Sequence, residues 1–188
     1  ARNHVRFEGP GIFADTTVNV NPTAEEMAEI AKMAAECVRF FDIEPRIAFI
    51  SYSNFGTNSD AEVKKVQKAV ELAKQLCPDT VIEGEMQVDP ALHPETAEQQ
   101  FPWSAIQGDA NVLIFPNLDA ANAAYKLVWR LSDAEAIGPI LMGVSKPVHI
   151  LQRGVEVNDI VNMIAVCAAD AVDHAASALA KAPRKAKK

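Results

Sequence analysis

Three segments of this 188-residue chain carry polar side chains in patterns that suit the binding of an anion. The first is residues 51–59, SYSNFGTNS, in which hydroxyls, amides and one glycine separate an apolar run from an amphipathic stretch. A turn of this kind before a helix offers backbone N–H groups and the positive end of the helix dipole, which attract phosphate and other anions. The turn is neither a P-loop nor a GxGxxG motif, so ordinary loop polarity explains it equally well.

The second segment, residues 115–122, also leads from a predicted strand into a predicted helix. Asn117 or Asp119 is placed there to cap the helix. Further along, Lys126 and Arg130 lie four residues apart and therefore share one helix face. They are interpreted either as solvated surface cations or as ligand contacts.

The third segment is Gln152-Arg153-Gly154, which precedes a helix carrying Asp159 and Asn162 on one face. The guanidinium of Arg153 presents a fork of donors that matches an oxyanion, with a surface salt bridge as the competing interpretation. The sequence has no Ser-His-Asp order, Cys–His pair or pair of carboxylates that indicates a catalytic centre.

Metal chemistry has no support in the sequence. Cys37, Cys77 and Cys167 are too far apart for a common zinc motif, and we expect them to be buried, reduced thiols. The four histidines are scattered and form no metal-binding pair.

Charge and hydropathy limit the class of partner. The net charge is −7, although the last eight residues, KAPRKAKK, hold five basic groups and no acid, so the rest is more acidic still. An acidic body argues against a nucleic-acid surface, and the basic end is interpreted as a solvated tail. No apolar run approaches the roughly 20 residues of a membrane span, and residues 1–10 do not resemble a signal peptide. We therefore expect a cytoplasmic protein without a membrane partner.

Strand-like and helix-like segments alternate along the chain. Apolar runs predict strands that begin near residue 11 and cover 46–51, 80–82, 111–115, 137–143 and 148–151. Apolar periodicity predicts helices over 23–41, 60–76, 118–131 and 155–179, with one short helix near 94–100 inside an irregular excursion over 84–102. The last helix is expected to bury a stripe made of Ile160, Ile164, Cys167 and Ala171. This alternation predicts an α/β fold, a Rossmann-like three-layer α/β/α sandwich with a mostly parallel sheet.

Five longer strings resemble the phosphotransacetylase family and occur in family order. They are SYSNFGTN (51–58), GEMQVDPAL (84–92), ANVLIFPNLDAANAAYKLVWRL (110–131), IGPILMG-x-x-KPVHILQRG (137–154) and DIVNMIAV (159–166). A complete domain of that family is nearly twice this length, with its active site between two subdomains. The resemblance implies a second subdomain over 1–146, a C-terminal segment and helix over 147–180 that pack towards an absent first subdomain, and a basic tail over 181–188.

One tripeptide distinguishes two branches of the family. Active phosphate acetyltransferases carry Ser-Arg-Gly before the last helix, and the serine works with a helix aspartate at the coenzyme A thiol. This chain retains Arg130, Arg153 and Asp159 but has Gln152 in place of the serine. An amide cannot take a proton as a hydroxyl–carboxylate pair can, so the resemblance implies no catalytic residue here.

SYSNFG, GEMQ and HILQRG are instead similar to the C-terminal domain of large hybrid NADP-dependent malic enzymes, which senses acetyl-CoA. This resemblance implies acetyl-CoA as an effector, a homo-oligomer, and a malic-enzyme domain in the same polypeptide that uses NADP and Mg²⁺ or Mn²⁺ to decarboxylate malate oxidatively to pyruvate. The implied acetyl-CoA contacts are Arg153, Arg130, Asp159, Asn162, Gln152, Ser53 and Asn54. An active phosphate acetyltransferase and a purely structural oligomerisation module are the alternatives.

Overall fold

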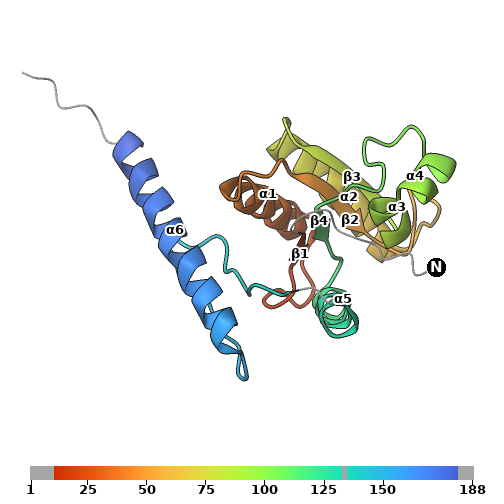
Figure 1. Cartoon of the computed structure of the whole chain (residues 1–188). Coiled ribbons are helices and arrows are strands. Elements are labelled where there is room, and N and C mark those ends of the chain that lie inside the picture. The colour runs from red at the N-terminus through yellow and green to blue at the C-terminus, as the bar shows by residue number, and fades with distance from the viewer. Residues whose placement is uncertain (1–10, 133–134, 182–188) are drawn as a thin grey trace, which may run out of the picture. The chain divides into compact units, whose positions relative to one another are not determined.

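A computed structural model of the chain describes residues 11–132 and 135–181, and these two ranges belong to two separate compact units (Figure 1). The first unit contains β1 (Ile12–Ala14), α1 (Ala24–Phe40), β2 (Arg46–Ile50), α2 (Ala61–Leu76), β3 (Val81–Met86), α3 (Val88–Leu92), α4 (Pro94–Gln100), β4 (Val112–Ile114) and α5 (Leu118–Leu131). The second contains α6 (Val157–Lys181). Residues 182–188 of the predicted basic tail lie outside the described residues.

The four strands form one parallel sheet in the order β1-β4-β2-β3. Val112 of β4 lies between Ile12 of β1 and Ile47 of β2, which fixes the register at the centre of the sheet. Because all the strands run the same way, the segments that follow them meet at one edge of the sheet. The predicted α/β fold with a parallel sheet is confirmed.

Both faces of the sheet are covered, as the continuous apolar character of the strands requires. Ala48, Ile50 and Leu113 belong to a buried cluster that also includes Ala91 of α3 and Ala121 of α5. Alternate residues of the same strands point to the other face. There α1 contacts β1 and β4, and α2 contacts β2 and β3 (Figure 1). The layers are therefore helices, sheet and helices.

Side-chain caps fix where the main helices begin. Thr23 and Glu26 form a reciprocal capping box at α1, in which the Thr23 N–H donates to Glu26 Oε2 at 2.8 Å. The side chain of Asn117 accepts the Ala120 N–H at 3.0 Å and caps α5, so the capping interpretation of Asn117 is confirmed.

Three predictions for individual elements are wrong. Residues 137–143 and 148–151 form no strand in the part of the chain that the structure describes, because a strand needs a paired neighbour and Pro139 has no N–H to donate. The excursion at 84–102 is more regular than expected, since β3 continues to Met86 and α3 precedes α4. On α6, Ile164 is 63% exposed and Met163 is buried instead.

The expected burial of the three cysteines is also wrong, because Cys37, Cys77 and Cys167 are all half-buried thiols. Burial raises the pKa of Cys77, and the nearby charges of Arg39 and Lys32 oppose this shift. The Cys77 thiol therefore stays protonated at neutral pH.

None of the described helices is both long enough and apolar enough to cross a membrane.

Candidate functional site

The carboxyl edge of the sheet between β2 and β4 is the candidate site in the first unit. These strands are neighbours, yet the helices that follow them, α2 and α5, cover opposite faces of the sheet. Ligands of parallel α/β sheets bind at such a switch point, in the crevice outside the strand ends. The segments there are residues 51–60 after β2 and residues 115–117 after β4.

The loop after β2 does not offer the free backbone donors that its sequence predicts, and this part of the anion-binding prediction is wrong. Asn54 N–H donates to Thr57 Oγ1 at 3.0 Å, and Asn58 N–H donates to Ser53 Oγ at 3.1 Å. Phe55 N–H reaches the backbone oxygen of Glu85 at 2.7 Å. The loop therefore uses its donors to hold its own shape.

Glu85 is the internal hydrogen-bond acceptor of this loop. It lies at the end of β3 and is 1% exposed, and its Oε1 accepts the Gly56 N–H at 2.7 Å and the Ser53 hydroxyl at 2.8 Å. Ser53 is itself 1% exposed, and its hydroxyl donates to Glu85 instead of pointing to solvent. The string GEMQ assigns no role to Glu85 by its sequence alone. The signal in the sequence is a glutamate between Gly84 and Met86, shortly after the predicted strand at 80–82.

Polar contacts also join this loop to the residue that follows β3. Asn54 Oδ1 accepts the Gln87 N–H at 2.7 Å, and Gln87 Nε2 donates to the Tyr52 backbone oxygen at 2.6 Å. Tyr52 Oη donates to Asp60 Oδ2 at 2.6 Å, which raises the pKa of Tyr52. Asn54 is half-buried at this edge, with its carbonyl oxygen committed to Gln87.

The loops after β1 and β4 are held by one carboxylate and one ammonium. Burial alone would raise the pKa of Asp15, but hydrogen bonds from the backbone of Thr17, Val18 and Asn19 and from the Asn19 side chain lower it. The ammonium of Lys65, on α2, donates to Asn21 Oδ1 at 2.7 Å and to the Pro116 oxygen at 3.1 Å. Lys65 therefore connects the loop after β1 to the loop after β4.

Arg130 lies exposed in the last turn of α5. Its guanidinium carbon is 4.0 Å from the centre of the Trp129 ring, in a cation–π contact. Lys126, one turn earlier, is exposed and lies over Tyr125 at 5.8 Å. Both cations are available at the surface of the first unit.

The second unit positions the other predicted contacts around the start of α6. Gln152 and Arg153 are exposed in the turn before this helix, and Gly154 has φ +80°, a left-handed conformation that favours glycine. Asp159 Oδ2 accepts the Glu156 N–H at 2.9 Å, so this carboxylate holds the first turn of α6. Asn162 lies on the same helix and is half-buried.

A buried histidine joins the segment before α6 to the helix. His149 Nδ1 accepts the Leu141 N–H at 3.3 Å, so in the neutral ring Nε2 carries the proton. That nitrogen lies 3.4 Å from Asp170 Oδ2. Among the described residues, no group of three or more His, Cys, Asp and Glu could hold a metal ion.

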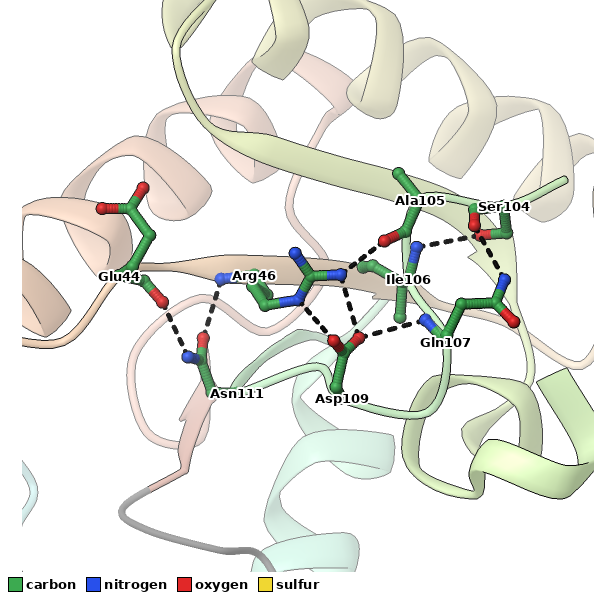
Figure 2. A network of polar contacts seen from close by, with 8 residues as sticks. All are labelled: Glu44, Arg46, Ser104, Ala105, Ile106, Gln107, Asp109 and Asn111. Carbon is green, nitrogen blue, oxygen red and sulfur yellow. Dashed lines mark hydrogen bonds and ion pairs between the residues drawn. The ribbon is translucent and has the colours of Figure 1, made fainter. Parts of the chain in front are cut away.

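The opposite edge of the sheet carries a polar network at the start of β2 (Figure 2). Arg46 Nε lies 2.9 Å from Asp109 Oδ2, and its guanidinium also donates to the backbone oxygen of Ala105. Asn111 accepts the Arg46 N–H at 2.8 Å and donates to the Glu44 oxygen at 2.8 Å. Arg46 Nε lies within ion-pair distance of Asp109 but makes no hydrogen bond of good geometry, and the other contacts fix residues 104–111 to the sheet.

Two surface hollows of about 290 and 400 Å³ lie near the start of β3 and share Cys77, Pro78 and Thr80. Because this is the amino end of β3, the hollows are not at the switch point. Neither hollow includes a predicted contact residue. The topology of the sheet, and not a surface hollow, therefore places the candidate site at the carboxyl edge.

The fold and the site define a parallel-sheet α/β domain whose polar loops gather at the carboxyl edge between β2 and β4. Residues 4–168 match the family described as phosphate acetyl/butaryl transferase, and the chain belongs to this family. Ser53, Asn54 and Arg130 belong to the first unit, whereas Gln152, Arg153, Asp159 and Asn162 belong to the second. That these residues bind acetyl-CoA together stays a prediction.

Relatives with two different names are similar to the chain. It is 49% identical over 164 residues to a phosphate acetyltransferase of Thermoanaerobacterium thermosaccharolyticum, and these cover 87% of this chain and 50% of that protein. It is 46% identical over 165 residues to an NADP-dependent malic enzyme of Escherichia coli, covering 87% of this chain and 22% of that enzyme. A crystal structure of a phosphotransacetylase from Streptococcus pyogenes matches with a TM-score of 0.82 and 45% identity, over 86% of this chain and 49% of that one. The chain thus spans about half the length of some of the phosphate acetyltransferases that it matches and less than a quarter of others.

Proposed function

We propose that this chain is the acetyl-CoA-sensing, catalytically inactive part of an NADP-dependent malic enzyme. The observation that carries the proposal is Gln152, because the family resemblance implies a serine at this position in active acetyltransferases. Sequence identity does not separate the two classes, because malic enzymes and acetyltransferases match the chain almost equally well. The tripeptide at 152–154 is therefore the feature that favours the malic-enzyme branch in this proposal.

The proposed effector site combines exposed cations with polar groups. Arg153 and Arg130 are exposed, and guanidinium groups suit the phosphates and carbonyls of an acyl-CoA. Asp159 already holds the start of α6, and in this proposal Asn162 and Gln152 supply amide groups. Asn54 lies on the loop that Ser53 and Glu85 hold at the carboxyl edge.

In this proposal the oxidative decarboxylation of malate to pyruvate takes place in another domain of the same polypeptide. That domain would hold NADP and Mg²⁺ or Mn²⁺, and the whole would be a cytoplasmic homo-oligomer. Acetyl-CoA inhibits if it binds the less active arrangement of the oligomer more tightly. The length of the matched relatives supports a longer polypeptide, since the chain covers 22% of the malic enzyme from E. coli.

The second candidate function is phosphate acetyltransfer, from acetyl-CoA and phosphate to acetyl phosphate and CoA. The relatives that carry this name, at 43–49% identity, favour it. This function requires that acetyl transfer proceed without the serine hydroxyl, because position 152 is a glutamine. A structural oligomerisation module is the third alternative and predicts no ligand.

Isothermal titration calorimetry of the natural full-length polypeptide with acetyl-CoA, run beside an assay of acetyl phosphate and CoA turnover, separates these functions. We expect binding without turnover. Arg153→Glu should weaken binding about tenfold or more, because it replaces a charge-assisted contact by a repulsion. Lys68→Glu, a charge reversal on the exposed face of α2, is the control. Turnover by the unmodified protein would establish the second candidate, and no heat at millimolar acetyl-CoA would leave only the structural module.

A further inference from the structure

We infer that Glu85 is a positioning residue. It holds residues 51–58 in the conformation that ligand binding at the carboxyl edge requires. The inference rests on the proposed function only for the identity of the ligand, acetyl-CoA. Glu85 itself is buried beneath the loop and is placed to act through Asn54, the half-buried amide of this loop.

Glu85 holds the loop through both its backbone and its side chain. Its backbone oxygen accepts the Phe55 N–H, and its Oε1 accepts the N–H of the next residue, Gly56. The same Oε1 accepts the Ser53 hydroxyl, and Ser53 Oγ in turn accepts the Asn58 N–H. The carboxylate therefore controls both ends of the loop, although it lies 29 residues from Gly56 in the sequence.

The conformation that Glu85 holds is one that the loop would not adopt readily by itself. Phe55 has φ +46°, which is unfavourable for a residue with a side chain, and Gly56 has φ +87°. Such backbone conformations persist only when surrounding contacts impose them. Without the carboxylate, we expect the backbone at Phe55 to relax and the amide of Asn54 to move with it.

A carboxylate is a costly choice for a purely structural position. Burying a carboxyl group carries a desolvation penalty, which its hydrogen bonds must offset. An apolar side chain cannot accept the two hydrogen bonds that converge on Oε1. The loop conformation, and not only the stability of the domain, therefore explains why position 85 carries a carboxyl group.

The loop also has a built-in spectroscopic reporter. The Phe55 ring packs 4.5 Å from the Trp103 ring and 5.1 Å from the Phe101 ring. Trp103 is 64% exposed, and the other tryptophan, Trp129, lies on α5. A change in the Phe55 backbone therefore alters the fluorescence of Trp103, and a background variant with Trp129→Phe isolates that signal.

The test compares Glu85→Met, which keeps the volume but removes the acceptor, with Glu85→Gln, which keeps one carbonyl oxygen. We expect Glu85→Met to raise amide hydrogen exchange at Gly56 and Asn58 about tenfold or more and to shift the Trp103 emission. In the full-length natural polypeptide it should weaken acetyl-CoA binding about tenfold, with Glu85→Gln in between. Glu83→Gln is the matched control, because Glu83 lies on the same strand but contacts Lys74 and Ser104.

Wild-type exchange, emission and affinity in Glu85→Met would overturn the inference. If that variant does not fold, Ser53→Ala decides, since it removes one contact to Glu85 and should raise exchange at Gly56, whose N–H is bonded to Glu85 and not to Ser53; unchanged exchange there overturns the inference too. If the wild-type protein binds no acetyl-CoA, the proposed function fails. The exchange measurements on the 188-residue chain then still decide the positioning role.

Discussion

Two carboxylates organise the loops at the carboxyl edge of the sheet. Asp15 collects the backbone N–H groups of the loop after β1, and Glu85 collects donors from the loop after β2. In each case the donors that an external anion would use are bonded to the protein itself. Under the proposed function, ligand recognition at this edge would depend on side chains such as Asn54, in a backbone that is already fixed.

Asp15 is expected to make a pH-dependent contribution to stability. Because its folded pKa is lowered from 3.8, its contribution is fully present above the unfolded pKa and is lost as the pH falls through the folded pKa. Asp15→Asn should lower the free energy of unfolding by about 1–2 kcal/mol at pH 7, since a charged acceptor is lost. Urea unfolding from pH 7 to pH 2.5 should show the difference shrinking below about pH 3.8. Asp79→Asn, at an exposed turn, is the control, and a difference that stays constant with pH would contradict the assignment.

Gln152 is the residue on which the assignment of an inactive domain depends. If activity was lost through this position alone, Gln152→Ser should raise acetyl phosphate formation in the full-length natural polypeptide above the wild-type background. Gln152→Ala should not, because alanine supplies no hydroxyl. The coupled release of CoA thiol from acetyl-CoA and phosphate measures both variants. Equal activity in the serine and alanine variants would show that the difference from active acetyltransferases lies elsewhere.

At the scale of elements, close backbone contacts hold α4 and the following loop in place. Gly108 has φ +78°, and a Cβ there would lie 2.3 Å from the Pro94 nitrogen at the start of α4. Residues 104–111 are also fixed to β2 by Arg46 and Asp109 (Figure 2). The route of the chain from α4 to β4 therefore requires a glycine at position 108.

Gly108→Ala should destabilise the first unit by about 3 kcal/mol or more, because the methyl group overlaps with backbone atoms that cannot move aside. Gly56→Ala is the matched comparison. Its φ of +87° is similar, but the nearest atom to a Cβ is 4.0 Å away, so the cost should be about 1 kcal/mol. Thermal and urea unfolding measure both variants. Equal losses would mean that backbone conformation alone, and not the contact with Pro94, determines the requirement.

At the scale of the whole molecule, the chain presents apolar surface that a longer polypeptide could cover. Leu127 and Leu131 of α5 are 58% and 82% exposed, and their helix has only one fully buried residue, Ala121. The matched phosphate acetyltransferases are longer, since the chain covers 50% of one and 23% of another. These observations support the proposal that this chain works within a larger protein.

Regulation is the property to test in that larger protein. If acetyl-CoA inhibits through this domain, Arg153→Glu should raise the acetyl-CoA concentration for half-inhibition of malate oxidation about tenfold or more, as linkage between binding and inhibition requires. NADPH formation from malate, titrated with acetyl-CoA, measures the shift for each variant against its own rate without effector. The Lys68→Glu variant should be inhibited by acetyl-CoA at the same concentration as the wild type. Inhibition of Arg153→Glu at the wild-type concentration would remove Arg153 from the effector site.

Local patterns in the sequence determined the regular elements of the first unit. Helical periodicity placed α1, α2 and α5, and apolar runs placed β2 and β4, because a helix stripe or a buried strand is encoded by neighbouring residues. The cap at Asn117 is similarly local, since its partner is three residues away. Resemblance of the longer strings indicated the family, which the match over residues 4–168 then established.

Only the tertiary structure decided what the loops do with their polar groups. The sequence of residues 51–59 suggests free N–H donors, but their acceptors include Glu85, which is distant in the chain and is brought near by the pairing of β2 with β3. The run at 137–143 resembles a strand, yet a strand exists only where another strand accepts and donates its hydrogen bonds. Contacts between distant residues carry no local pattern, and for that physical reason the conformation of the candidate site was fixed by the fold.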